Sequence, residues 1–92
     1  MAYFVYVLIN DESGRRYTGH TDNLSRRLAE HNGASSNPGR FTRKYPGVWR
    51  LVYQQQHDTR AGAMAREKWL KSGIGRKWLD ETVGRASPPK AD

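Results

Sequence analysis

The hydrophobic and polar positions of the first twenty residues predict two strands joined by a turn. Residues 3–9 form a continuous run of aromatic, β-branched and aliphatic side chains, which is typical of a buried strand. Residues 10–14 read Asn-Asp-Glu-Ser-Gly and predict a turn, after which residues 15–20 are expected to return as a strand closed by Gly19. The chain therefore begins with a predicted β-hairpin.

A helix is predicted directly after the hairpin. Either Thr21 or Asp22 is expected to cap it, and Gly33 is expected to end it. One face of this helix is expected to carry Leu24, Leu28 and His31, because these residues are spaced at i, i+4 and i+7.

The second half of the chain predicts a loop, a third strand and two further helices. We expect these elements at residues 33–47, 49–56, 59–71 and 74–82. Asp58 or Thr59 is expected to cap the longer helix, and the pair Ser72-Gly73 to end it. The order ββαβαα predicts an α+β domain in which a small antiparallel three-stranded sheet is flanked by helices.

Length and composition fit one small domain. Of the 92 residues, 36% are hydrophobic, which is enough for one core. We expect the domain to span residues 1–83 and the tail 84–92 to be disordered. The absence of cysteine excludes disulfides, thiolate metal sites and cysteine nucleophiles. No apolar run is long enough to span a membrane and no basic leader precedes the first strand, so we expect a cytoplasmic monomer without a membrane partner.

The charge of the chain favours a polyanionic partner. The formal net charge is +7, and residues 40–77 hold ten Lys or Arg against two acidic side chains. Tryptophan and tyrosine are interleaved with these cations, a pattern that suits a phosphate backbone and stacked bases. General basicity for solubility is the alternative. The residues expected to contact nucleic acid are His20, Arg40, Arg43, Lys44, Lys68, Lys71, Arg76 and Lys77.

Glu67 breaks the pattern of its helix. Ala63, Leu70 and Ile74 form an apolar stripe that is expected to face the core, and Glu67 lies on that stripe. A buried carboxylate without a partner costs several kcal/mol, so this one needs a cation, hydrogen-bond donors or a metal. A salt bridge to an arginine, or a place at the edge of the stripe where the side chain meets water, would also explain it.

Arg27 borders the apolar face of the first helix, whereas Arg26 points away. His31 lies one turn after Arg27, so both side chains can address one spot. A histidine packed in the core is the alternative interpretation. Three further polar residues, Asp22, Glu30 and His57, are interpreted as cap or surface residues.

The triplets Phe4-Val5-Tyr6 and Tyr17-Thr18-Gly19 resemble the two half-motifs of the GIY-YIG nuclease superfamily. The resemblance covers residues 3–82 and is strongest to the small standalone bacterial branch. The positions that match the functional residues of that superfamily are Tyr6, Tyr17, Arg27, His31 and Glu67. Two departures stand out: His20 replaces a common lysine, and residues 79–82 lack a frequent asparagine.

The resemblance implies hydrolysis of a nucleic-acid phosphodiester by an activated water with one divalent metal, Mg²⁺ or Mn²⁺. Glu67 would bind the metal. Arg27 would neutralise the phosphate and Tyr17 would hydrogen-bond to it. Tyr6 would orient or deprotonate the water, with His31 as a proton relay because histidine titrates near neutral pH. DNA is favoured over RNA as the partner. The alternative function is a catalytically weak or inactive nucleic-acid-binding module with the same fold.

A shared role for Tyr6 and Tyr17 restricts the register of the two strands in the hairpin. The two residues must be near cross-strand neighbours on one face, so paired residue numbers must sum to an odd value near 23. The turn must then contain an even number of residues or a bulge. Ordinary sheet packing is the alternative interpretation of each tyrosine taken alone.

Overall fold

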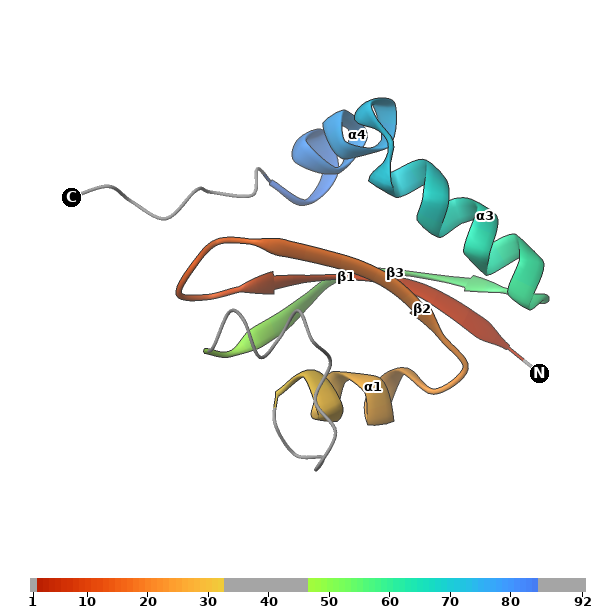
Figure 1. Ribbon diagram of the computed structural model, residues 1–92, viewed down its shortest axis with the longest axis horizontal. Helices are drawn as coiled ribbons and strands as arrows, with labels where there is room; N and C mark the ends of the chain where they lie inside the picture. Colours follow the sequence, from red (N-terminus) through yellow and green to blue (C-terminus); the bar gives the residue numbers. More distant parts are fainter. Residues whose placement is uncertain (1, 33–46, 85–92) are drawn as a thin grey trace.

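The structure is a computed structural model that describes residues 2–32 and 47–84. One face of the sheet carries α1 and the opposite face carries α3 and α4 (Figure 1). The elements in chain order are β1 (Tyr3–Asn10), β2 (Arg16–Thr21), α1 (Leu24–His31), β3 (Trp49–His57), α3 (Arg60–Lys71) and α4 (Gly73–Val83). The predicted α+β class and the order ββαβαα are confirmed. The expectations for Gly33, Arg40, Arg43, Lys44 and the tail lie outside the described residues.

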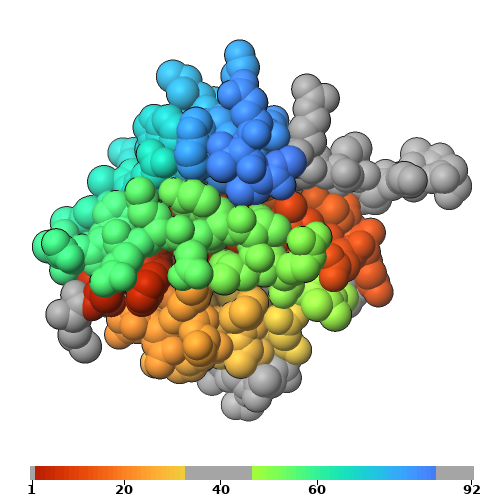
Figure 2. Space-filling view, turned by 180° about the vertical axis from the view of Figure 1, so that it is seen from behind, coloured from red at the N-terminus to blue at the C-terminus, as the bar shows by residue number. Residues whose placement is uncertain are grey.

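The three strands form one antiparallel sheet in the order β2-β1-β3. β1 is therefore the central strand, and Figure 2 shows β3 running between α1 on one side and α3 with α4 on the other. Because side chains alternate along a strand, β1 contributes Val5 and Val7 to one core and Tyr6 and Leu8 to another. All four are at most 1% exposed, which explains the unbroken apolar run in the sequence.

The hairpin turn is built by Asn10 and Gly14. The Asn10 side chain is fully buried, and its Oδ1 accepts hydrogen bonds from the backbone N–H groups of Glu12 at 3.0 Å and Ser13 at 2.8 Å. Gly14 adopts a φ of 71°, a conformation that favours glycine. The turn between paired strands therefore has a defined length, which sets the register of β2 against β1.

The helix caps partly correct the sequence-based expectations. Asn23, rather than Thr21 or Asp22, caps α1, and its side chain accepts from the backbone N–H of Arg26. The Thr21 hydroxyl instead accepts a hydrogen bond from the backbone N–H of Asn23 and so orients the cap residue. Thr59, one of the two predicted residues, caps α3.

The apolar stripe predicted through Ile74 is wrong at its end. α3 ends at Lys71, and Ser72 caps both its C-terminus and the N-terminus of α4. The change of helix direction leaves Ile74 74% exposed, while Leu79 of α4 is buried against Ala63 and Leu70. None of the helices in the described ranges is long and apolar enough to cross a bilayer.

Candidate functional site

The register of the hairpin places Tyr6 and Tyr17 on one face of the sheet. Tyr6 is opposite Gly19 and Leu8 is opposite Tyr17, so the two tyrosines are diagonal neighbours with ring centroids 6.1 Å apart. The expectation of near cross-strand neighbours is confirmed. The backbones of Asn10 and Arg15 are hydrogen-bonded, and the turn between them contains an even number of residues, the four residues 11–14. A Cβ on Gly19 would lie 2.8 Å from the Tyr6 hydroxyl, which explains why glycine ends the second triplet.

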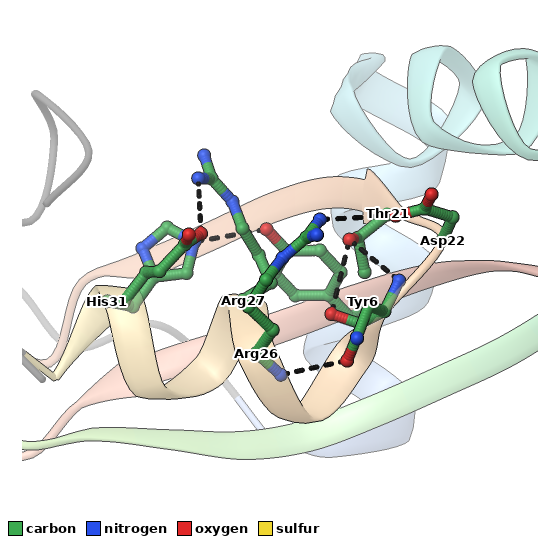
Figure 3. A network of polar contacts seen from close by, with 8 residues as sticks. Tyr6, Thr21, Asp22, Arg26, Arg27 and His31 are labelled. Atoms are coloured by element: carbon green, nitrogen blue, oxygen red, sulfur yellow. Dashed lines mark hydrogen bonds and ion pairs between the residues drawn. The ribbon is translucent and has the colours of Figure 1, made fainter. Parts of the chain in front are cut away.

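His31 joins the two tyrosines from the last turn of α1. Its Nε2 lies 3.0 Å from the Tyr6 hydroxyl, and the two side chains point toward each other in Figure 3. The His31 ring centroid lies 4.7 Å from that of Tyr17, and His31 is only 4% exposed. Its Nδ1 is buried and has no hydrogen-bond partner within the described residues. The three rings thus form one polar cluster, in which Tyr6 and His31 are buried and Tyr17 is half-buried.

Burial shifts the acid–base properties of this cluster. It raises the pKa of Tyr6, an effect that the neighbouring Arg27 only partly offsets, so the phenol keeps its proton at neutral pH. Burial and the positive charge of Arg27 lower the pKa of His31 to about 4. The expectation that His31 titrates near neutral pH is therefore wrong, because the imidazole is held in its neutral form.

Arg27 lies beside this cluster and is paired with Glu30. Its Nη1 donates to Glu30 Oε1 at 3.0 Å, and the Arg27 side chain is 31% exposed against 58% for Arg26. Burial lowers the pKa of Arg27, but hydrogen bonding with Tyr6 and Glu30 outweighs burial and raises it, so the guanidinium stays charged. The interpretation of Glu30 as a surface residue missed this pair, although its i, i+3 spacing from Arg27 is the signal that predicts it.

Glu67 approaches β2 from the opposite face of the sheet. His20 Nδ1 lies 2.6 Å from Glu67 Oε1, and Lys71 Nζ donates to Oε2 at 2.7 Å. Burial alone would raise the pKa of Glu67, but these two contacts outweigh it and lower the pKa, so the carboxylate stays ionised. The partners of the inward carboxylate are therefore a histidine and a lysine, rather than the arginine considered from the sequence.

The edge strand β2 connects these two groups of side chains. Tyr17 and Gly19 point toward α1, and the alternate residue His20 points toward α3. A hollow of about 330 Å³ near one end of β2 is lined in part by His20 and Arg27. A second hollow, of about 370 Å³, is lined in part by Tyr17 and Lys71. The candidate site therefore lies along the free edge of β2, with its residues supplied from both faces of the sheet.

The chemistry of Glu67 fits a divalent cation held by one carboxylate. No group of three potential His, Cys, Asp or Glu ligands occurs in the described part of the chain. Mg²⁺ is commonly bound by one or two carboxylates together with waters and substrate phosphates. Each oxygen of an ionised carboxylate has two lone pairs, so the hydrogen bonds from His20 and Lys71 leave Glu67 acceptor capacity.

The other residues expected to contact nucleic acid differ in their exposure to solvent. Lys68, Arg76 and Lys77 are exposed on α3 and α4, whereas His20 is half-buried against Glu67. Residues 79–82 form the segment in which the GIY-YIG superfamily often has an asparagine. In this chain, two residues of the segment make structural contacts. Leu79 is buried in the core, and Asp80 accepts from Arg16 at 2.8 Å.

Comparison with known proteins relates most of the described fold to one family. A family model described as the GIY-YIG catalytic domain matches residues 2–77. A UPF0213 protein of Desulfotalea psychrophila is 40% identical over 70 residues, which cover 76% of this chain and 61% of that protein. A UPF0213 protein of Natronomonas pharaonis is 39% identical over 71 residues, which cover 76% of this chain and 78% of that protein. The solution NMR structure of a UPF0213 protein from Bacillus halodurans has a TM-score of 0.53 and 30% identity, covering 91% of this chain and 87% of that one.

Proposed function

This chain belongs to the GIY-YIG catalytic-domain family, and from that premise we propose that it is a metal-dependent endonuclease that hydrolyses phosphodiester bonds, with DNA preferred to RNA. The observation that carries the proposal is the buried hydrogen bond between Tyr6 and His31, with the charged Arg27 beside it. Such a pair of neutral groups next to a cation suits proton transfer from a water that attacks a phosphate.

Tyr6 and His31 are proposed to activate the water together. The raised pKa of Tyr6 favours the phenol as donor to the neutral His31 Nε2. As the water attacks phosphorus, its proton passes to the Tyr6 oxygen and the Tyr6 proton passes to His31. The new bond joins the water oxygen to phosphorus, the bond from phosphorus to the leaving oxygen breaks, and the leaving oxygen takes a proton from solvent. Because its pKa is about 4, His31 is in its accepting form throughout the neutral range.

Arg27 and Tyr17 are proposed to hold the scissile phosphate. The planar guanidinium of Arg27 matches two phosphate oxygens, and Arg27 pairs with Glu30 while lying beside Tyr6. Tyr17 lies on the edge strand beside the Tyr6–His31 pair, so its hydroxyl is a suitable donor to the same phosphate. Both contacts gain strength as negative charge builds on the phosphoryl oxygens.

Glu67 is proposed to hold the divalent metal, Mg²⁺ or Mn²⁺, with His20 and Lys71 keeping the carboxylate ionised and in place. A bound divalent cation supplies Lewis-acid stabilisation of charge on the phosphoryl and leaving oxygens. Lys68, Arg76 and Lys77 are exposed on α3 and α4, and Arg76 lines one hollow together with Tyr17 of β2. These three cations are proposed to contact the backbone of the nucleic acid.

The proposal is tested by incubating the purified protein with plasmid DNA, single-stranded DNA, branched DNA and RNA of matched length. Each substrate is combined with Mg²⁺, Mn²⁺ or EDTA, and the products are separated on gels. We expect nicking of DNA that requires the metal. Cleavage that persists in EDTA would contradict the metal requirement, and equal cleavage of RNA would contradict the preference for DNA.

One observation favours the alternative of a nucleic-acid-binding module with little or no activity. Both oxygens of Glu67 are already engaged by His20 and Lys71, and the segment after α3 offers a buried Leu79 and a paired Asp80 where a further polar ligand would stand. Binding of DNA without cleavage under every metal condition would support this second function.

A further inference from the structure

A polar hollow of about 330 Å³ lies where the end of β2 meets the beginnings of α1 and α3. Its volume is at the lower end of the range for ligand pockets. Apart from Tyr3, the lining consists of polar or charged residues, so the hollow suits a hydrated or anionic group better than an apolar ligand. The lining includes Tyr3, Asp22, Arg26, Arg27, Glu30 and Arg60.

The charges around this hollow are unbalanced in favour of cations. Arg26 is paired with Asp22 at 3.2 Å, as Figure 3 shows, and Arg27 is paired with Glu30 at 3.0 Å. Arg60, the first residue of α3, has no ion-pair partner among the described residues. The hollow therefore contains one cationic side chain more than its carboxylates neutralise.

Tyr3 positions the unpaired Arg60. The guanidinium carbon of Arg60 lies 5.7 Å from the centroid of the Tyr3 ring, within the range of a cation–π contact. Tyr3 is the first residue of the central strand and packs against the core, so it is a firm support for the arginine. A guanidinium resting on a ring keeps its N–H edge available for a planar, bidentate partner.

We propose that this hollow is a subsite for the backbone phosphate that neighbours the scissile phosphate, with Arg60 as its main ligand and Tyr3 as its support. The proposal rests on the proposed nuclease function and extends its substrate contacts to a second nucleotide. Arg27 lines the same hollow, so a phosphate bound to Arg60 adjoins the one assigned to Arg27. Two arginines that border one hollow suit two neighbouring phosphates of one strand, because each phosphate carries a negative charge that one cation can neutralise.

The first test compares the salt dependence of duplex DNA binding for wild type, Arg60→Ala and Arg50→Ala. Arg50 is a matched control because it is exposed, carries the same charge, pairs with Asp11 and does not line the hollow. We expect Arg60→Ala to weaken binding about tenfold at low salt and to lower the slope of log K against log salt by about 0.9, the loss of one phosphate contact. Equal slopes for Arg60→Ala and Arg50→Ala would overturn the subsite while leaving the nuclease function intact.

The second test uses the support residue. Tyr3→Phe keeps the ring and is expected to bind DNA like wild type, whereas Tyr3→Leu keeps an apolar side chain but is expected to give part of the Arg60→Ala effect. Thermal melting followed by circular dichroism checks that each variant folds. If Tyr3→Leu binds with the wild-type affinity and slope, the assigned role of the ring is overturned.

A titration with inorganic phosphate alone separates this proposal from the nuclease function. NMR of the arginine Nε–H groups is expected to show that phosphate shifts the Arg60 signal in wild type, and that this shift is reduced in Tyr3→Leu. A protein that binds no nucleic acid but shows the Arg60 shift would overturn the nuclease function and support the anion site. The absence of any Arg60 shift would overturn the subsite.

Discussion

The two faces of the sheet are packed by different chemistry although they share β1. Toward α3 and α4, the buried cluster is aliphatic, with Val5, Val7 and Leu70 fully buried. Toward α1, the same strand contributes Tyr6, whose hydroxyl is bonded to the buried His31. Burial of polar groups is costly unless they are hydrogen-bonded, so the bond between Tyr6 and His31 allows the α1 face to bury a phenol and an imidazole together.

The two faces also differ in how their helices are held against the sheet. The aliphatic face joins the two longer helices to the sheet, and its charged residue Glu67 lies at the β2 edge. The α1 face relies on a helix of eight residues, which is too short to be stable without tertiary contacts. Asn32, directly after α1, exchanges hydrogen bonds of 3.0 and 2.8 Å with the backbone of Trp49 and so ties this helix to β3. The face that carries the Tyr6–His31 pair is thus held by polar contacts in addition to the packing of Leu24 and Leu28.

The largest expected effect comes from Glu67, the charged residue of the aliphatic face. Glu67→Ala is expected to lower the single-turnover rate of DNA cleavage by at least about 1000-fold, because the Lewis-acid contribution of a metal is worth several kcal/mol. The fold should survive, since the side chain lies at the edge of the core and its lost contacts are partly exposed. The rate is measured with saturating enzyme, and the fold by thermal melting. A fall in Tm of more than about 10 °C, which corresponds to about 2 kcal/mol for a domain of this size, would make Glu67 a structural residue.

Substitution of Arg27 tests whether the α1 face contributes to the rate of cleavage. Arg27→Ala is expected to lower the cleavage rate about 100-fold, because it removes a donor that acts mainly on transition-state charge. DNA affinity should change little, since other cations still hold the backbone. Lys should restore only part of the rate, because it lacks the bidentate fork. Arg26→Ala, one position away on the same helix, is expected to cost a little affinity and almost no rate. Equal rate effects of the two alanine variants would remove Arg27 from the catalytic set.

The buried His31 predicts that stability falls with acid before the carboxylates titrate. Tyr6, Tyr17, Arg27 and Glu30 surround the imidazole, and its pKa falls from 6.5 to about 4 on folding. Below pH 6.5 the unfolded chain takes up a proton that the folded chain does not, so the free energy of unfolding should fall by about 2 kcal/mol between pH 7 and pH 5. Urea denaturation at both values measures it. His31→Gln should remove most of this difference, and an unchanged difference in that variant would assign it to another group.

His20 is expected to give the smallest of these effects, through Glu67. It is a positioning residue, so His20→Ala should weaken Mn²⁺ binding about tenfold, in keeping with the loss of a hydrogen bond to a metal ligand. Mn²⁺ affinity is measured by electron paramagnetic resonance on the protein without DNA. His20→Gln retains a donor and should recover part of the affinity. The same Mn²⁺ affinity in wild type and His20→Ala would show that Lys71 alone holds the carboxylate.

Much of the fold could be predicted because its signals are local. The apolar run of β1, the turn composition at residues 10–14 and the spacing within each helix are properties of neighbouring residues. Two candidate site residues break those local patterns, Glu67 on the stripe of α3 and Arg27 beside the apolar face of α1. Tyr6 and Tyr17 fit the pattern of their strands, and only the family resemblance identifies them. A residue that contradicts its own element is visible before its partners are known.

Two errors concern nearby residues that compete for one role. Asn23 replaces Thr21 as the cap of α1 because the Thr21 hydroxyl bonds to the Asn23 backbone. Ile74 leaves the core because the chain changes direction at Ser72 and Leu79 takes the buried place. The sequence gives no signal for the proposed role of Arg60, because that role depends on contact with Tyr3, which lies 57 positions earlier in the chain.

The sequence by itself determined the order of the elements and the identity of the unusual side chains, because both depend on periodicity and residue type. Only the tertiary structure decided that Tyr6 and His31 form one buried pair, that Glu67 reaches β2 through His20 from the opposite face, and that the pKa of His31 falls to about 4. Those properties depend on distance, burial and neighbouring charge between residues far apart in the chain, and such quantities exist only once the sheet register has brought them together.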